Sequence, residues 1–411
     1  MLNWANQFGI CCFLDSNAYD FKHSSYECVA GVGAINSITA RAGNALQQLK
    51  IFQQQHNGWL FGHLAYDLKN ELEQLYSKNP DYCQFPDLFF FIPQYVLFLN
   101  QQQCSIYCNN AAEAAAVFEA INNTAHTNTI HTTKLNAIES RFSRQEYLHT
   151  IDTLKQHIAR GDCYELNFCQ EFYAEKAIID PVAIFNRLSI ASPNPFAAFY
   201  KLAEKYLLCA SPERYLKKQG EQILSQPIKG TGKRNTNNAA ADELSKQYLL
   251  QSQKERAENV MVVDIVRNDL SKVCKNGSVT VDELFGLYSF PQVHQMISTI
   301  TGQLLPHTSF VDIIKASFPM GSMTGAPKKR VMELIERYEK TRRGIYSGSV
   351  GYITPNGDFD FNVVIRSIVY NKSSQYLSYQ VGSGITHYCK AEEEYEECKL
   401  KASAIEKILL Q

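Results

Sequence analysis

The chain has 411 residues, of which 45% are hydrophobic and 20% are charged, and its formal net charge is −1. This composition is typical of globular proteins and argues against long disordered regions. Proteins that bind nucleic acids or anionic membranes commonly carry an excess of basic residues. Because this chain is nearly neutral, we expect neither as a partner.

The amino terminus and the cysteines indicate the cellular compartment. Residues 1–16 lack the basic and apolar segments of a signal peptide, and no apolar run is long enough to span a bilayer. The twelve cysteines include no Cys-x-x-Cys pair. We therefore expect a cytoplasmic protein with reduced thiols, rather than disulfides or a zinc site.

The first third of the chain differs in pattern from the rest. Residues 1–100 alternate short apolar runs with polar breaks, which predicts a β-rich region. An Ala-rich helical piece follows at 111–120, and residues 122–133 have the Asn-, Thr- and His-rich composition of a linker. We place a domain boundary there, between an N-terminal β-rich region at 1–135 and a catalytic domain at 136–411.

Strands and helices alternate beyond that boundary. Ser143 and Glu146 form a capping-box pattern before a helix over 147–159, which Gly161 ends. The remaining pattern predicts strands at 206–210, 216–218, 344–353, 363–370 and 376–380, and helices at 239–273, 328–339 and from 392 to the end. This mixture, which has no repeat of fixed period, predicts an α+β fold.

The predicted helix over 239–273 carries acidic residues, among them Glu258, beside a nearly continuous apolar run at 260–266. An ordinary amphipathic helix would place such acids on a solvated face. The apolar run instead indicates a helix that is buried on most sides, where carboxylates need a cation or hydrogen-bond donors.

The carboxy-terminal helix supplies a matching acidic set. Glu394, Glu397 and Lys401 have the i, i+3, i+7 spacing that places side chains on one helix face. Mg²⁺ commonly binds one or two protein carboxylates together with substrate oxygens and water, so Glu258 and Glu397 fit a magnesium site. A solvated acidic patch is the alternative.

Two glycine-containing segments are candidate anion sites. Residues 382–384, Gly-Ser-Gly, follow the strand at 376–380 and would present successive N–H groups. In the second segment, residues 324–328, Pro327 suits the first turn of the next helix, whose start would attract a carboxylate. Tight turns use the same residue types, so each pattern alone leaves that alternative open.

Lys229 and Glu213 are candidate catalytic groups. Lys229 lies in a short motif, Pro-Ile-Lys-Gly-Thr, that leaves little room for a flexible exposed side chain. A partly desolvated lysine has a lowered pKa and becomes a usable amine nucleophile, and Glu213 would be a general acid for the same site. The alternatives are a surface lysine at a strand end and a surface ion pair between Glu213 and Arg214.

Seven strings in this order resemble the chorismate-utilising enzyme family over about residues 142–405. They are Ser-Pro-Glu-Arg at 211–214, Pro-Ile-Lys-Gly-Thr at 227–231, Asp-Ile-Val-Arg-Asn-Asp-Leu at 264–270, Val-His-Gln-Met-Ile-Ser at 293–298, Thr-Gly-Ala-Pro-Lys at 324–328, Val-Ile-Arg-Ser at 364–367 and Gly-Ser-Gly-Ile at 382–385. The acidic set around Glu397 completes the series. The resemblance implies a large layered β-sandwich with flanking helices and two interwoven α/β subdomains.

The resemblance also implies roles for individual residues. It makes Glu258 and Glu397 ligands of Mg²⁺, with Glu394 acting through water, and the metal holds the ring carboxylate of chorismate. It places His294 along the substrate ring, among the catalytic residues. The groups expected to clamp the two substrate carboxylates are Thr324, Gly325, Tyr346, Arg366, Gly382, Gly384 and Lys401.

One position indicates the branch of the family. Anthranilate synthases carry Ala where this chain has Lys229. In aminodeoxychorismate synthases that lysine resembles a nucleophile for C2 of chorismate, while the counterpart of Glu213 protonates the departing C4 hydroxyl and ammonia then enters at C4. The resemblance thus implies amination of chorismate to 4-amino-4-deoxychorismate, on the route to 4-aminobenzoate and folate.

Other activities stay open at this point. Isochorismate synthases carry a water-activating lysine in the strand at 164–167, where this chain has Glu165 and aminodeoxychorismate synthases usually have Gln. Water addition is therefore disfavoured, yet anthranilate synthase or isochorismate synthase remains an alternative. An inactive chorismate-binding regulatory relative is the alternative from another class.

The source of ammonia follows from a missing motif. The chain has no Gly-x-Cys-x-Gly segment followed by His-x-Glu, which marks a glutaminase. The resemblance therefore implies that a separate glutamine amidotransferase subunit supplies ammonia. Residues 13–16 and 194–196 lie where relatives build a tryptophan pocket, although feedback control does not follow from them.

Overall fold

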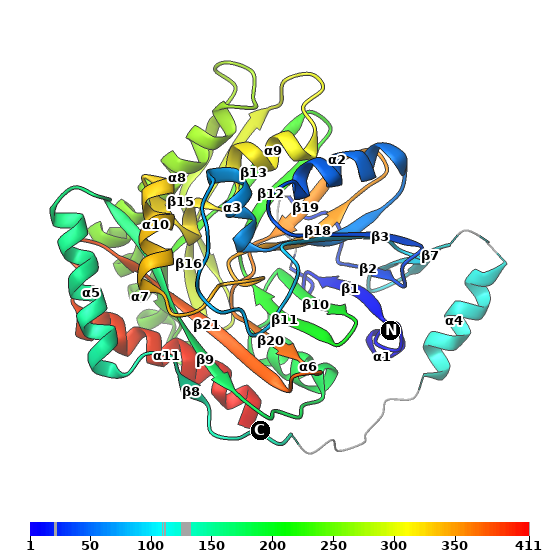
Figure 1. Ribbon diagram of the computed structural model, residues 1–411, viewed down its shortest axis with the longest axis horizontal. Helices are drawn as coiled ribbons and strands as arrows, with labels where there is room; N and C mark the ends of the chain where they lie inside the picture. The colour runs from blue at the N-terminus through cyan, green and yellow to red at the C-terminus, as the bar shows by residue number, and fades with distance from the viewer. Residues whose placement is uncertain (20–22, 109, 111, 125–132, 411) are drawn as a thin grey trace.

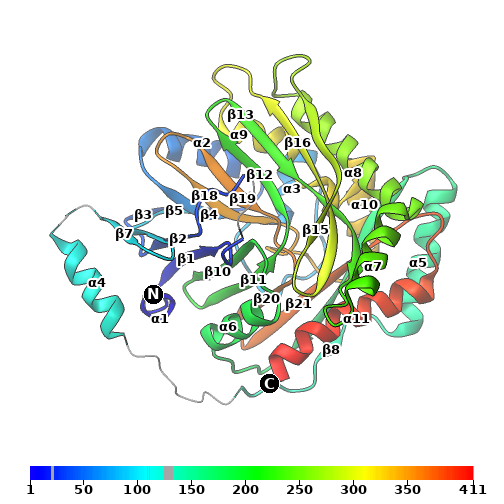
Figure 2. The ribbon, with the colours of Figure 1, turned by 180° about the vertical axis from the view of Figure 1, so that it is seen from behind.

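The computed structural model describes residues 1–411 except 20–22, 109, 111, 125–132 and 411. Its strands form two antiparallel sheets that are stacked as layers, with helices on their outer faces (Figures 1 and 2). The expected α+β fold, a layered β-sandwich with flanking helices, is confirmed.

The first sheet contains eleven strands, and β8 pairs with β9 outside the main path. In spatial order its strands are β17 (Gly325–Ala326), β9 (Glu165–Ala174), β21 (Tyr376–Ile385), β20 (Ser367–Asn371), β11 (Lys205–Ser211), β10 (Phe196–Leu202), β1 (Ile10–Asp15), β2 (Cys28–Val32), β6 (Tyr95–Leu99) and β7 (Cys104–Cys108), with β8 at Glu139–Ser140.

The second sheet contains ten strands, and β15 pairs with β16 outside the main path. Its strands, in spatial order, are β14 (Ile228–Lys233), β16 (Val293–Gln303), β13 (Gln222–Gln226), β12 (Arg214–Gln219), β19 (Phe359–Asn362), β18 (Ser349–Ile353), β4 (Leu60–Leu64), β5 (Leu88–Ile92) and β3 (Asn36–Ala40), with β15 at Thr280–Ser289.

The described α-helices are α1 (Leu2–Ala5), α2 (Ala45–Gln55), α3 (Lys69–Glu73), α4 (Glu113–Asn123), α5 (Arg144–Ala159), α6 (Pro181–Ala191), α7 (Ala239–Gln251), α8 (Gln253–Ser271), α9 (Phe310–Ser317), α10 (Lys328–Tyr338) and α11 (Ala391–Leu410). Two short 3₁₀ helices, η1 (Tyr66–Leu68) and η2 (Gly321–Met323), complete the set. Among the described residues, no helix combines the length and apolar character that crossing a bilayer requires.

Three apolar cores hold these layers together. One lies between the sheets and contains Phe61, Phe91, Tyr200 and Leu207, contributed by strands of both. A second packs α5, α6, α10 and α11 against the first sheet, and a third packs α2, α8 and α9 against the second. Burial of apolar surface on both faces of each sheet therefore stabilises the sandwich.

The N-terminal strands are interleaved with later ones. In the first sheet β1 pairs with β10, and in the second β4 pairs with β18. Residues 1–135 thus contribute strands to the same two sheets as residues 136–411, and the proposed division into two domains stays a prediction. Most of the expected linker at 122–133 lies outside the described residues.

Several local predictions are confirmed and others are corrected. The capping box at Ser143 and Glu146 is present at the start of α5. The single helix expected over 239–273 is wrong, because Ser252 has extended backbone and its hydroxyl caps a new helix by accepting from the Glu255 N–H. The strands expected at 344–353 and 363–370 begin later than predicted. The chain makes a turn before β18, which begins at Ser349, and the left-handed backbone of Arg366 (φ 50°) means that β20 begins only at Ser367.

A buried ion cluster ties the N-terminal third to α10. Lys69 is fully buried, and its Nζ lies 2.6 Å from Glu336 Oε1 and 3.9 Å from Asp67 Oδ1. Asp67 also accepts a hydrogen bond of 2.9 Å from the Gly344 N–H, at the turn before β18. Each partner therefore depends on the others for compensation in a dry environment.

We predict that Lys69→Met lowers the free energy of unfolding by about 3 kcal/mol, because it leaves buried carboxylates without their cation. Urea denaturation followed by circular dichroism measures the change. The control is Lys78→Met at an exposed position of the same segment, which should change stability by less than about 0.5 kcal/mol. Equal stability of the two variants would contradict a role for this cluster.

Candidate active site

The centre of the site is an ion pair that bridges the two sheets. Lys229 lies on β14, the first strand of the second sheet, and Glu165 begins β9, near the same end of the first sheet. Lys229 Nζ donates a hydrogen bond of 2.8 Å to Glu165 Oε1. Their side chains are only 12% and 5% exposed, so solvent screens the pair weakly.

Gly384 lies directly against this ion pair. A Cβ atom at position 384 would lie 3.1 Å from both Glu165 Oε1 and Lys229 Nζ, and 3.3 Å from Glu258 Oε2. Side chains from β9, β14 and α8 therefore converge on one point of β21, and only glycine leaves them that space.

The expected end of the strand before residues 382–384 is corrected by this arrangement, while anion binding by Gly382 and Gly384 stays a prediction. These residues lie inside β21 and pair with β9, Gly382 opposite Cys169 and Gly384 opposite Asn167. In an extended strand alternate N–H groups point to the same side, so Gly382 and Gly384 share one direction and Ser383 has the opposite one. Both glycines also permit close approach of side chains from β9.

The charge state of Lys229 differs from the expectation. Burial alone would lower the pKa of this amine, but Glu165, Glu258 and Glu213 more than offset burial and raise the pKa. The predicted depression of the pKa is therefore wrong for the free enzyme. The carboxylates that hold Lys229 in place also keep it protonated.

Glu258 has an incompletely satisfied carboxylate. Burial raises its pKa to about 7, with Glu165 and Glu255 adding to the effect and Lys229 opposing it. Its Oε1 atom is buried and has no hydrogen-bond partner among the described residues. A buried carboxylate oxygen in this condition is suited to a bound cation.

Glu213 is a further buried acid near Lys229. Burial raises its pKa to about 7, against the opposing influence of the Ser322 hydroxyl, Lys229 and Arg366. Burial in turn lowers the pKa of Arg366 to about 10, so the guanidinium stays charged at neutral pH. The structure thus brings Glu213, Lys229 and Arg366 together, as the sequence motifs suggested.

The alternative pairing of Glu213 with Arg214 is wrong. Arg214 Nε donates a hydrogen bond of 2.9 Å to Asp360 Oδ1, and its Nη2 donates one of 3.0 Å to Asp360 Oδ2. Neighbouring residues in one motif therefore face different sites. Glu213 faces Lys229, while Arg214 faces a second cavity.

Two acids of α11, Glu394 and Glu397, were also predicted to belong to the site. Glu394 is buried, accepts from the Ser383 hydroxyl and lies 3.4 Å from Lys254 Nζ. Glu397 is half-exposed and pairs with Lys401 Nζ at 2.7 Å. No three His, Cys, Asp or Glu side chains in the described ranges form a ready-made metal site. Metal binding by Glu258, Glu394 and Glu397 thus stays a prediction.

Three further residues predicted to bind substrate, Gly325, Thr324 and Tyr346, are in contact with other parts of the protein. Gly325 (φ 143°) presses against β9, where a Cβ atom would lie 2.1 Å from the Glu165 carbonyl oxygen. The buried Thr324 hydroxyl donates to the Met320 carbonyl at 3.0 Å. Tyr346 is buried near Cys169, which adds to the effect of burial in raising the pKa of the phenol.

His294 is held by two polar side chains. Its Nε2 lies 3.0 Å from Asp242 Oδ1, and its Nδ1 lies 2.9 Å from Ser289 Oγ. Both ring nitrogens are therefore engaged by α7 and β15. The structure gives His294 a position that anchors these elements, and its catalytic role stays a prediction.

Two residues that hold the site together, Arg343 and Asn259, were not predicted from the sequence. Arg343 is buried, pairs with Glu339 and donates hydrogen bonds to the carbonyls of Asn167, at 2.7 Å, and Met323, at 2.6 Å. It thereby fixes β9 against the segment before Thr324. Asn259 lies 3.4 Å from the Lys229 carbonyl and accepts from Ser298. The expectation of a helix buried on most sides is wrong, since α8 exposes one face that includes Val260. The position of Asn259 directly after Glu258 was the available signal.

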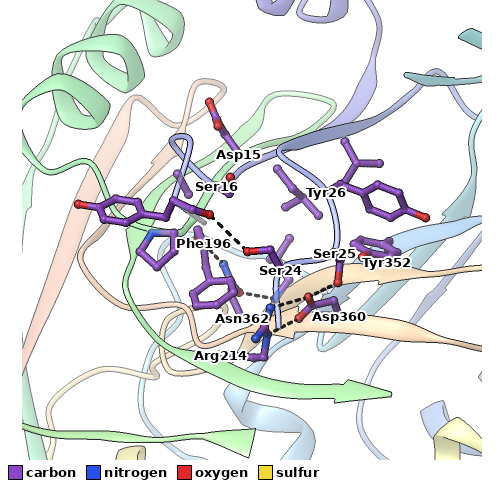
Figure 3. A pocket seen from close by; sticks show the side chains of 16 residues that line it. Asp15, Ser16, Ser24, Ser25, Tyr26, Phe196, Arg214, Tyr352, Asp360 and Asn362 are labelled. Carbon is purple, nitrogen blue, oxygen red and sulfur yellow. Dashed lines mark hydrogen bonds and ion pairs between the residues drawn. The ribbon is translucent and has the colours of Figure 1, made fainter. Parts of the chain in front are cut away.

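A separate cavity lies on the Arg214 side of the sheets (Figure 3). Its lining includes Asp15, Phe196, Asn362 and the Arg214–Asp360 pair. Ser25 donates a hydrogen bond of 2.9 Å to Asp360 there. The cavity is lined by the segments around 13–16 and 194–196, and Lys229 does not line it.

The raised pKa of Glu213 has a measurable consequence for stability. The unfolded chain loses this proton near pH 4.5 and the folded chain near pH 7, so the folded state binds more protons in between. Stability must therefore fall as pH rises through that window, by an amount on the order of 3 kcal/mol.

Gln carries no titratable proton, so the Glu213→Gln variant lacks this pH dependence. We predict that its free energy of unfolding, taken relative to that of the wild type, is higher at pH 8 than at pH 5. Urea denaturation of both proteins at the two pH values checks this. A stability difference that does not change with pH would mean that Glu213 titrates normally in the folded protein.

Comparisons with known proteins identify the family of this chain. The model of the chorismate binding enzyme family matches residues 10–407. The chain is 31% identical to aminodeoxychorismate synthase component 1 of Bacillus subtilis over 365 residues, which is 86% of this chain and 77% of that protein. It is 34% identical to the Escherichia coli protein of the same name over 354 residues, again 86% and 77%.

Solved structures share the fold. Anthranilate synthase component I from Streptococcus pneumoniae superposes with a TM-score of 0.78 at 24% identity, over 94% of each chain. The menaquinone-specific isochorismate synthase of Escherichia coli gives a TM-score of 0.78 at 17% identity, over 100% of this chain and 91% of that one. Fold, motifs and sequence identity lead to one conclusion: the chain belongs to the family of chorismate binding enzymes.

Proposed function

We propose that this enzyme aminates chorismate at C4 and produces 4-amino-4-deoxychorismate for the synthesis of 4-aminobenzoate and folate. The observation that carries the proposal is the buried Lys229 amine, held among Glu165, Glu258 and Glu213. Similarity to proteins named aminodeoxychorismate synthase component 1 supports it. The expected cytoplasmic location belongs to the same proposal.

Lys229 and Glu213 would divide the chemistry between them. The neutral amine of Lys229 attacks C2, and Glu213, which is protonated below about pH 7, gives its proton to the departing C4 hydroxyl. Ammonia then forms the bond to C4 as the lysine leaves C2. Because an enzyme amine occupies C2, ammonia is directed to C4.

Arg366 would bind a carboxylate of the substrate. Its guanidinium is buried beside Glu213 and charged at neutral pH, and a buried cation gains much from an ionised partner. Tyr346, Thr324 and Lys401 are proposed to assist this clamp. Since these groups come from the segments before β17, β18 and β20 and from α11, they would fix the ring relative to Lys229 from several directions.

Glu258 and Glu397, with Glu394 through water, would hold Mg²⁺. The buried Glu258 Oε1 atom has no hydrogen-bond partner among the described residues and is suited to be a metal ligand, because a bound cation would compensate its burial. When bound, the ion supplies positive charge that neutralises the ring carboxylate of chorismate.

We predict that Glu258→Gln weakens Mg²⁺ binding at least tenfold, since an amide oxygen carries no net charge. Isothermal titration calorimetry with MgCl₂ in the presence of chorismate measures the affinity. Asp264→Asn, at an exposed position of the same helix, is the matched control and should bind Mg²⁺ normally. Unchanged affinity of the Glu258 variant would remove this residue from the metal site.

Ammonia would come from a glutamine amidotransferase subunit. The relatives are named as component 1 of their synthase, which implies a further component in those proteins. Glutamine should therefore support turnover by this chain only when such a partner is added, whereas ammonium salts should suffice without it.

Product analysis tests the proposed function. Purified enzyme is incubated with chorismate, Mg²⁺ and ammonium, and aminodeoxychorismate lyase is then added. Formation of 4-aminobenzoate supports the proposal. Formation of 2-aminobenzoate or isochorismate would instead assign an anthranilate or isochorismate synthase, and binding without turnover would indicate an inactive regulatory relative.

We predict that Lys229→Ala lowers formation of the 4-amino product at least about 100-fold and shifts the residual product toward 2-aminobenzoate, because C2 is then free for ammonia. Liquid chromatography separates the two aminobenzoates. Lys233→Ala, at an exposed position of the same strand, should retain normal turnover. An unchanged product in the Lys229 variant would refute the nucleophile.

A further inference from the structure

We propose that Glu165 is the catalytic base that takes the proton from Lys229 before the amine attacks the substrate ring. The inference rests on the proposed function and identifies the proton acceptor that this function requires. It starts from the direct contact between the two side chains, in which Lys229 Nζ donates to Glu165 Oε1 at 2.8 Å.

The backbone of Glu165 is held firmly in position. Ala326 of β17 lies opposite Glu165, and Gly325 packs so closely that a Cβ atom there would lie 2.1 Å from the Glu165 carbonyl oxygen. On the other side, Gly384 leaves space for the carboxylate and the amine together. Strands on both sides of β9 therefore orient the carboxylate toward Lys229.

A base is needed because the resting lysine is charged. Lys229 Nζ lies 2.8 Å from Glu165 Oε1 in an ion pair, and this buried carboxylate favours the charged form of the amine. An ammonium group has no free electron pair and cannot attack carbon. With a side chain only 12% exposed, the lysine depends on a protein group to accept its proton.

Glu165 is the best placed of the acids around Lys229. Glu213 faces the lysine from the segment after β11, Glu258 and Glu255 from α8, and Glu397 from α11. Among the described residues, none of these four forms an ion pair with Nζ. Glu213 must keep its own proton for the leaving hydroxyl, and Glu258 and Glu397 are assigned to the metal.

The proton balance closes over one turnover. Lys229 passes a proton to Glu165, the neutral amine forms the C2–N bond, and the C4–O bond breaks as Glu213 protonates the hydroxyl to water. Ammonia then forms the C4–N bond and the C2–N bond breaks. The new ammonium returns a proton to Glu213, and Lys229 recovers its proton from Glu165.

Glu165→Gln tests the step because glutamine keeps the size and a hydrogen-bonding oxygen but accepts no proton. We predict that kcat at pH 7 falls at least about 100-fold. The residual rate should rise about tenfold per pH unit on the alkaline side, because only solvent then deprotonates the lysine. The wild type should lack that rise. Retention of kcat within threefold, or a wild-type pH profile, would overturn the proposal.

Glu165→Ala gives a second test that a merely structural role would not satisfy. Added formate should restore part of its activity, since a small carboxylate fits the vacated space and accepts the proton. Glu171→Gln is the matched control, a buried carboxylate of the same strand that pairs with Arg141. It should retain kcat without formate. A folded Glu165→Ala enzyme that formate does not rescue would contradict the role of Glu165.

The wild-type product separates this inference from the proposed function. If the wild type forms 4-amino-4-deoxychorismate while Glu165→Gln behaves like the wild type, only the base is refuted. If the wild type forms another product, both are refuted. Thermal melting of each variant shows that kcat refers to folded enzyme.

Discussion

One ammonium group surrounded by buried carboxylates determines the character of this site. Lys229 compensates the charge of Glu165 directly and that of Glu258 and Glu213 at longer range, in surroundings that exclude most water. Without the lysine, three acids would be buried with little compensation. The same attraction that stabilises the cluster keeps the amine protonated, so chemistry at Lys229 requires a proton acceptor within reach.

The fold creates this cluster by joining the ends of two sheets. β14 carries Lys229 at one edge of the second sheet, while β17, β9 and β21 form the corresponding end of the first. Glycines at 325 and 384 allow the backbones and charged side chains to approach closely. Arg343 then fixes β9 to the segment before Thr324, and the helices α8 and α11 bring the remaining acids to the rim.

Local signals predicted the parts of the molecule that local physics controls. The capping box of α5 and the acidic face of α11 were readable because their determinants lie within a few residues. The pKa of Lys229 was not, since its direction depends on acids from β9, α8 and the segment after β11 that only the fold brings together. The same holds for Gly384, whose pattern suggested a loop, and for the Arg343–Glu339 pair, which lies outside every motif.

The central claim is that the Lys229 amine forms a bond to the substrate ring, and trapping that bond tests it most directly. Enzyme mixed with chorismate and Mg²⁺ in the absence of ammonia is quenched, digested and examined by peptide mass spectrometry. The account predicts a mass gain of chorismate less one water on the peptide that contains Lys229. An enzyme that turns over fully when ammonia is added, yet carries no adduct or carries it on another residue, would contradict the account.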